Sequence, residues 1–175
     1  MKVKFCFALV LVSAMLCGII GASQDGPIQE TKPAPAIDRR SYRLGEIEAF
    51  SEMVGKGVKT LAISDVLTTD ETNALIDEAQ HTAEKYGVHD YVEPDLLVTD
   101  LFAESITRGK TVILIYKSPE TLAAYQQLKA DKTRLVKEGH YQGASRVDIA
   151  RRFGRLLSYP DEEINHLLRD PQREA

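Results

Sequence analysis

Cysteine and tryptophan are the residues that this 175-residue sequence has least of. There is no tryptophan, and the two cysteines, Cys6 and Cys17, both precede Gln24. If the residues before Gln24 are removed on export, the remaining chain can form no disulfide, no cysteine-ligated metal site and no thiolate nucleophile. Aromatic residues make up 7% of the chain, which leaves few side chains to stack on the bases of single-stranded nucleic acid.

The local signatures of common catalytic and cofactor-binding sites are also missing. The sequence contains no G-x-S-x-G, G-x-x-x-x-G-K-[ST], G-x-G-x-x-G or H-E-x-x-H motif. No two of its histidines lie within five residues of each other, and they are His81, His89, His140 and His166. We therefore expect no cofactor and no metal site within one segment, although a site assembled across the fold is still allowed.

Positively charged residues are fewer than negatively charged ones. Lys and Arg number 22 against 26 Asp and Glu, which gives a formal net charge of −4. Loss of the residues before Gln24 would remove Lys2 and Lys4 and leave 20 basic against 26 acidic residues, a net charge of −6. Because binding to nucleic acid requires a basic face that neutralises phosphates, we expect no nucleic-acid partner.

The N-terminus has the layout of a signal peptide. Lys2 and Lys4 precede an apolar stretch over residues 5–20, and small residues follow up to Ser23. The stretch of about 16 residues is shorter than the roughly 18–20 that cross a membrane comfortably. Residues 1–23 are therefore predicted to be a cleaved signal peptide, and the protein to be exported to the periplasm or secreted. The alternatives are an uncleaved membrane anchor, and a lipoprotein acylated at Cys17, which the bulky Leu16 disfavours.

Residues 24–41 are predicted to form a flexible linker. They include three prolines, Pro27, Pro33 and Pro35, and almost no large apolar side chains. Such a segment cannot bury enough apolar surface to offset the entropy lost on ordering. Residues 42–175 are then expected to form a single α/β domain.

Apolar periodicity and turn residues predict the elements of that domain. Helices are expected over residues 42–53, 68–86, 119–138, 144–157 and 161–168, and strands over residues 58–63, 88–92 and 111–116. Residues 111–116 include the run VILIY, which is apolar throughout and predicts a strand buried on both faces at the centre of the sheet. Residues 95–106 fit a short helix or a further strand equally well.

The order strand, helix, strand over residues 58–92 has the size of a βαβ unit. We therefore expect an α/β fold with a small, mostly parallel sheet of three or four strands, helices packed on it, and a helical C-terminal third. In a parallel sheet, ligands bind beyond the carboxyl ends of the strands. That rule would bring Ser64, Asp65 and Thr68 close to Lys117 and Ser118, the last two supplying a positive charge and a hydroxyl for a small anion. The alternative, which is favoured, is that Ser118 is only the N-cap of the following helix and Lys117 a solvated strand end.

A cluster of arginines lies in the predicted helix over residues 144–157. Arg151 and Arg155 are four residues apart and share a helix face, while Arg152 can pair with Asp148 on another. A pair of guanidinium groups can clamp a carboxylate or a phosphate. The alternative is a solvated face that pairs with acidic residues of neighbouring helices. Further candidates nearby or upstream are Arg146, Tyr141, Tyr159, Asp95 and Asp100.

Two classes of function follow from these features. The first is an exported, non-enzymatic module that binds a small anionic ligand or a protein partner, with Arg151, Arg155, Lys117 and Ser118 as ligand-binding residues. The second is a small secreted hydrolase or transferase whose site combines the strand ends with the Arg-rich helix. A membrane would be a partner only through an uncleaved signal segment. The absence of local catalytic motifs favours the first class.

Overall fold

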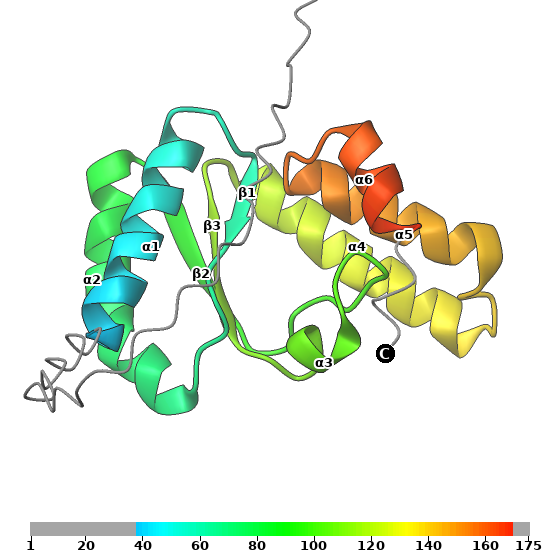
Figure 1. Cartoon of the computed structure of the whole chain (residues 1–175), viewed down its shortest axis with the longest axis horizontal. Coiled ribbons are helices and arrows are strands. Elements are labelled where there is room, and N and C mark those ends of the chain that lie inside the picture. Colours follow the sequence, from blue (N-terminus) through cyan, green and yellow to red (C-terminus); the bar gives the residue numbers. More distant parts are fainter. Residues whose placement is uncertain (1–37, 170–175) are drawn as a thin grey trace, which may run out of the picture. The chain divides into compact units, whose positions relative to one another are not determined.

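The computed structural model describes residues 38–169, which belong to one compact unit of the chain. The predicted signal peptide and residues 24–37 of the predicted linker lie outside these residues, whereas residues 39–41 of that linker begin the first helix. The described part contains a three-stranded sheet and six helices (Figure 1). In chain order the elements are α1 (Arg39–Gly55), β1 (Leu61–Ile63), α2 (Thr69–Tyr86), β2 (His89–Glu93), α3 (Glu104–Thr107), β3 (Val112–Tyr116), α4 (Pro119–Lys137), α5 (Gly143–Leu156) and α6 (Asp161–Leu167).

The sheet is antiparallel, so the expectation of a mostly parallel sheet was wrong. Its strand order is β1-β3-β2, and β3 runs antiparallel to both neighbours. The two edge strands β1 and β2 are therefore parallel to each other, but β3 lies between them. The cause is the link from β2 to β3. A parallel pair needs a crossover that returns the chain to its starting end, usually a long helix. Here the link holds only the four-residue α3, so β3 begins where β2 ends, with Glu93 opposite Val112.

The prediction that VILIY forms the central, doubly buried strand is confirmed. All five residues of β3 are buried. Their alternation sends Ile113 and Ile115 into a core under α1 and α2, and Leu114 and Tyr116 into a second core under α4, α5 and α6. The two groups of helices accordingly cover opposite faces of the sheet (Figure 1).

Local sequence signals set most helix boundaries. A capping box begins α2, since the Thr68 side chain accepts from the Glu71 amide and the Glu71 carboxylate accepts from the Thr68 amide. Gly87 ends α2 in the left-handed conformation, with φ of 64°. Residues 95–106 are mostly a loop and reach only the first residues of α3, so neither a helix nor a strand spans the segment. Val136 lies near the end of α4 and is 55% exposed.

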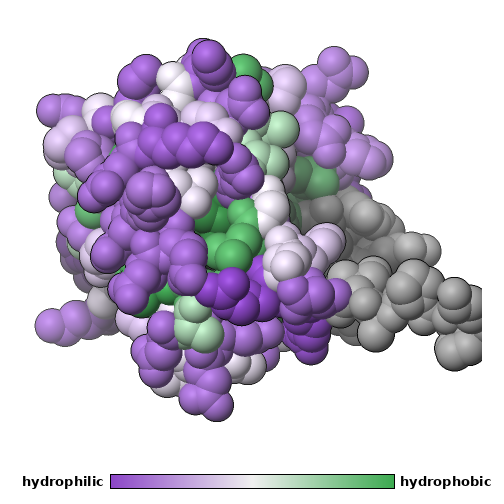
Figure 2. Space-filling model, turned by 90° about the vertical axis from the view of Figure 1, so that its left-hand side faces the viewer, coloured by the Kyte–Doolittle hydropathy of each residue, from purple (hydrophilic) through white to green (hydrophobic). Residues whose placement is uncertain are grey.

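The face that carries α1 and α2 is mostly hydrophilic, with a small hydrophobic area at its centre (Figure 2). Among residues 38–169, no helix has both the length and the apolar character required to cross a bilayer.

Candidate functional site

The two groups of strand-end residues that the sequence analysis brought together lie at opposite ends of the sheet. Ile63, the last residue of β1, pairs with Leu114, whereas Tyr116, the last residue of β3, pairs with Leu61. Because the strands are antiparallel, their carboxyl ends point in opposite directions. Ser64 and Asp65 therefore do not lie near Lys117 and Ser118, and this prediction was wrong. The rule applied to them holds for parallel strands.

Lys117 and Ser118 each have a local partner instead. The Lys117 ammonium donates to the carbonyl oxygen of Gly55, 2.9 Å away at the end of α1. Ser118 occupies the N-cap position of α4, as predicted, but its side chain accepts no capping hydrogen bond and lies 3.3 Å from the Thr121 hydroxyl. Pro119 follows at the first helical position, where its missing N–H costs nothing.

The Arg-rich helix is α5, and most of its guanidinium groups are already engaged. Arg155 donates from Nε and Nη2 to the two carboxylate oxygens of Asp161, at 2.8 and 3.1 Å. Arg152 pairs with Asp131 at 2.9 Å and, as predicted, with Asp148 at 3.7 Å. Arg151 is half-buried. A ligand that bridges Arg151 and Arg155 would therefore have to displace the bidentate contact to Asp161.

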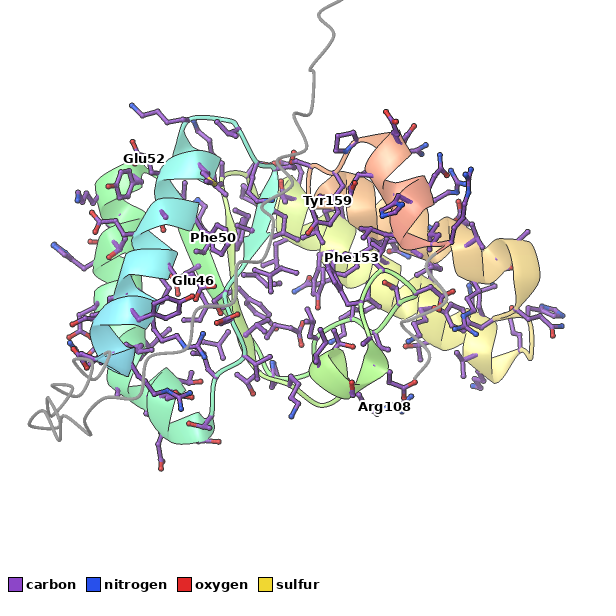
Figure 3. All side chains as sticks on the ribbon, viewed as in Figure 1. Glu46, Phe50, Glu52, Arg108, Phe153 and Tyr159 are labelled. Atoms are coloured by element: carbon purple, nitrogen blue, oxygen red, sulfur yellow. The ribbon has the colours of Figure 1, made fainter. Side chains whose placement is uncertain are left out.

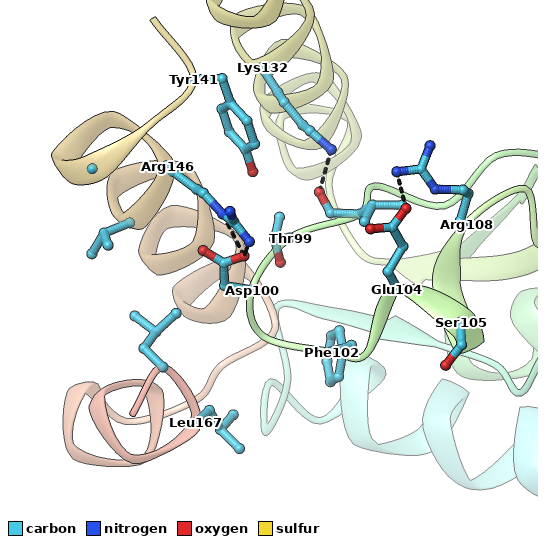
Figure 4. Close-up of a pocket in the computed structure, with 14 residues that line it drawn as sticks. Thr99, Asp100, Phe102, Glu104, Ser105, Arg108, Lys132, Tyr141, Arg146 and Leu167 are labelled. Carbon is cyan, nitrogen blue, oxygen red and sulfur yellow. Dashed lines mark hydrogen bonds and ion pairs between the residues drawn. The ribbon is translucent and has the colours of Figure 1, made fainter. Parts of the chain in front are cut away.

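A polar cavity lies beside α5, with a volume of about 780 Å³ (Figure 4). It is enclosed by the loop before α3, by α3 itself, and by side chains of α4, α5 and the end of α6. Three cations from different elements face it, namely Arg108 after α3, Lys132 of α4 and Arg146 of α5. Neither Arg151 nor Arg155 lines it. We call this space the basic cavity.

Lys132 is the most enclosed of the three cations. Its Nζ donates to the carbonyl oxygen of Val98, 2.7 Å away, and lies 5.2 Å from the centroid of the Tyr141 ring. Burial, and the nearby positive charge of Arg108, lower the pKa of the Lys132 ammonium. A lysine has three N–H donors, so the contact to Val98 leaves two for a ligand.

The two arginines are held by carboxylates within the cavity wall. Arg146 donates from Nε to a carboxylate oxygen of Asp100, 2.7 Å away, and its Nη2 contacts the same oxygen. Arg108 pairs with Glu104, one turn earlier. These pairs fix the guanidinium groups at the rim and leave the cavity with three positive and two negative charges.

Hydroxyl groups complete the polar lining. Tyr141 points its hydroxyl into the cavity, between Arg146 and Thr99 (Figure 4). Burial, and the negative charge of Asp100, raise the pKa of the Tyr141 phenol, which therefore keeps its proton and can donate it in a hydrogen bond. Thr99 is buried and its oxygen accepts from the Leu101 amide at 3.3 Å, which leaves its hydroxyl hydrogen available.

Helix α4 fixes the position of the loop after β2, which supplies part of the cavity lining. Three side chains on one face of α4 bind the loop after β2. The Tyr125 hydroxyl accepts from the Leu97 amide at 3.0 Å. The Lys129 ammonium donates to the carbonyl oxygen of Asp95 at 2.5 Å and to the buried Glu93 carboxylate, at the end of β2, at 2.8 Å. The Lys132 ammonium contacts Val98. The spacing of four and three residues brings all three side chains to one helix face, and the loop they hold leads directly to Thr99 and Asp100.

The arrangement is suited to holding an anion. It combines one net positive charge, hydroxyl donors and an apolar floor that includes Phe102, Val147 and Leu168. No group of three potential metal ligands occurs among residues 38–169. Sequence reasoning had singled out Tyr141 and Arg146 as parts of one local cluster and Asp100 separately, but had not connected Asp100 with the other two. It missed Lys132, Arg108 and Thr99, which lie on three separate segments and share no motif.

Comparison with known proteins identified no relative. No protein-family model, no curated protein and no solved structure matches this chain.

Proposed function

We propose that the protein is an exported, non-enzymatic module that binds a small organic anion in the basic cavity. The observation that carries the proposal is the convergence of Arg108, Lys132 and Arg146, from three separate elements, on one cavity of an acidic chain. Export is supported by Lys2, Lys4 and the apolar stretch that follows them.

The chemistry of the cavity favours a ligand with a single carboxylate or phosphate and an apolar part. A carboxylate ligand, with one negative charge, balances the three cations and two carboxylates of the lining, and a phosphate monoester brings up to two negative charges. The partly desolvated Lys132 gains most from such a ligand, because a charge-assisted hydrogen bond compensates for the water it has lost. An apolar group on the ligand would cover Phe102 and the end of α6, as in most small-molecule sites.

Titration calorimetry with benzoate and phenyl phosphate tests this proposal. Lys132→Gln should weaken binding by about tenfold, or about 1.4 kcal/mol, because it removes the central charge but keeps a polar side chain. Arg134→Gln is the matched control, since Arg134 belongs to the same helix, is exposed and pairs with Glu138. Equal affinity of parent and Lys132→Gln for both probes would refute the basic cavity as the site.

The same titrations separate the basic cavity from the site that the sequence analysis favoured. The double variant Arg151→Gln, Arg155→Gln should bind both probes as the parent does. If it loses binding while Lys132→Gln keeps it, the anion binds on α5 and the arginine pair is the site.

N-terminal sequencing of exported material should give a first residue near Ser23 or Gln24, and an intact Met1 on a membrane-bound chain would contradict export with cleavage.

A further inference from the structure

A second cavity, with different chemistry, follows the free edge of β1. Its volume is about 610 Å³, within the range of small-molecule sites. Its walls come from α1, from β1 and the residues after it, from the segment that leads into α3, and from the segment after α5. Most of the lining is apolar and includes Phe50, Ile63, Ile106 and Leu157. We call this space the β1 groove.

The groove lies where β1 has no strand neighbour. In the order β1-β3-β2, β1 is an edge strand, and edges of this kind are usually covered. In Figure 3, Phe50 of α1 and Tyr159 after α5 lie on either side of β1, and both line the groove. Ile106 is 58% exposed and Val66 36% exposed, so large apolar side chains along this groove face solvent.

One cation in the groove has no acidic partner. The Lys59 ammonium donates to the carbonyl oxygen of Leu157, 3.0 Å away, and lies 5.5 Å from the centroid of the Tyr159 ring. Among residues 38–169 no carboxylate lies within ion-pair distance of it. Lys59 is half-buried, and burial lowers the pKa of its ammonium. Two of its three N–H donors are left for another acceptor.

The other charges of the groove cancel. Arg43 pairs with Asp65 and also donates to the carbonyl oxygen of Val66, 3.3 Å away. The groove therefore combines a long apolar wall with one uncompensated positive charge, that of Lys59. Its complement is a molecule with one negative charge and one elongated apolar part.

We propose that the β1 groove binds a fatty-acid-like monocarboxylate, with the carboxylate on Lys59 and the hydrocarbon chain along Phe50, Ile63 and Ile106. This site uses none of the three cations of the basic cavity, so it stands whether or not an anion binds there. The side chain of Phe102 lines both spaces and forms part of the wall between them. The charge on Lys59 selects the carboxylate, and the apolar wall selects the chain.

Titration of the purified protein with decanoate and with decanol, below their aggregation concentrations, tests this site. Lys59→Gln should weaken decanoate binding about tenfold and leave decanol binding nearly unchanged, because only the acid contacts the ammonium. Lys56→Gln, an exposed lysine three residues earlier, is the matched control and should bind both probes as the parent does. Ile106→Asn should weaken binding of both probes, and its side chain is exposed enough for the variant to fold.

Four results would overturn the proposal. The first is an unchanged ratio of decanoate to decanol affinity in Lys59→Gln. The second is equal loss of decanoate binding in Lys132→Gln, which would place the acid in the basic cavity. The third is no binding of either probe by the parent, as expected if another part of the chain fills the groove. The fourth is a dimer by light scattering that decanoate does not dissociate and Ile106→Asn does, which would make the groove a surface between two copies.

Discussion

Gly154 of α5 lies directly against Ile164 of α6. A Cβ atom at Gly154 would be 2.7 Å from Cγ1 of Ile164 and 3.3 Å from Cδ1 of Leu101. Gly154 and Ile164 are buried, and the close approach lets α6 fold back onto α5 beside the basic cavity. Glycine is required here for space and not for its backbone freedom, since Gly154 is not among the glycines with positive φ.

Gly154→Ala should therefore destabilise the protein. Overpacking in a filled core costs about 1–3 kcal/mol, which exceeds the roughly 1 kcal/mol that alanine gains over glycine in a helix. Gly45→Ala is the control, because Gly45 is also helical but has nothing within 4 Å of an added Cβ. Urea denaturation should give a lower free energy of unfolding for Gly154→Ala and a higher one for Gly45→Ala. Stabilisation by both substitutions would contradict the close contact.

A charge in the central strand should prevent folding. Ile113 is fully buried in β3, the central strand of the sheet. Its side chain packs in the core under α1 and α2. Ile113→Asp would bury an unpaired carboxylate, whose cost of several kcal/mol is comparable to a whole stability of about 5–15 kcal/mol. Circular dichroism should show a largely unfolded chain. Ile113→Val keeps an apolar side chain and should cost only about 0.5–1.5 kcal/mol.

The pH dependence of the free energy of unfolding, in the acidic range, should depend on Glu46. One oxygen of its carboxyl group accepts from the Asp65 amide at 2.9 Å, while the other is buried, accepts no hydrogen bond and lies 3.8 Å from Nη1 of Arg43. Burial, and the nearby charge of Asp65, raise the pKa of Glu46. Between its unfolded and folded pKa values, the folded state holds more protons than the unfolded state. The stabilisation from Glu46 is therefore full below the unfolded pKa and is lost as the pH rises through the folded pKa.

Urea midpoints of parent and variants across the acidic range measure this dependence. Glu46→Gln should remove part of the fall in stability that the parent shows on raising the pH through this window. Glu52→Gln removes an exposed carboxyl from the same helix, so the difference between the two variants isolates the buried group. Identical pH profiles for parent and Glu46→Gln would mean that Glu46 titrates alike in the folded and unfolded states.

Sequence reasoning found most of the elements but not how they are joined. The VILIY run, the capping box at Thr68 and Glu71, and Gly87 are local signals, and they belong to a strand and a helix that the sequence predicted. The direction of β3 is not local. It depends on whether residues 95–106 form a crossover helix, and that segment was ambiguous because a loop with one helical turn carries no periodicity. One wrong assumption about strand direction then moved Lys117 and Ser118 to the wrong end of the sheet.

The basic cavity could not be predicted from the sequence, for a related reason. Arg146 and Tyr141 stood out as part of a local cluster, but Lys132 looked like one of several polar residues on α4. Its role comes from the loop that α4 holds, and the contact from Lys132 to Val98 spans 34 positions. The pairing of Arg155 with Asp161, in contrast, joins neighbouring helices, and the sequence had anticipated an acidic partner there.

The final prediction concerns the hydrogen bond that links α4 to this loop. The Tyr125 ring is fully buried, and its hydroxyl accepts from the Leu97 amide at 3.0 Å, near Glu93. Tyr125→Phe keeps the ring packing but leaves the buried Leu97 N–H without a partner, at a cost of about 1–3 kcal/mol. Tyr42→Phe is the control, because the Tyr42 side chain is exposed and its hydroxyl can bond to water. Urea denaturation should show the loss for Tyr125→Phe alone.

The same substitution reports on the basic cavity. The segment anchored at Leu97 continues to Thr99 and Asp100, so loss of this anchor should also raise amide hydrogen exchange over residues 97–102. Binding of benzoate should then weaken although none of the lining residues has changed. If Tyr125→Phe lowers stability but leaves exchange in residues 97–102 and benzoate affinity as in the parent, then Lys129 and Lys132 suffice to hold the loop, and Tyr125 contributes to the core alone.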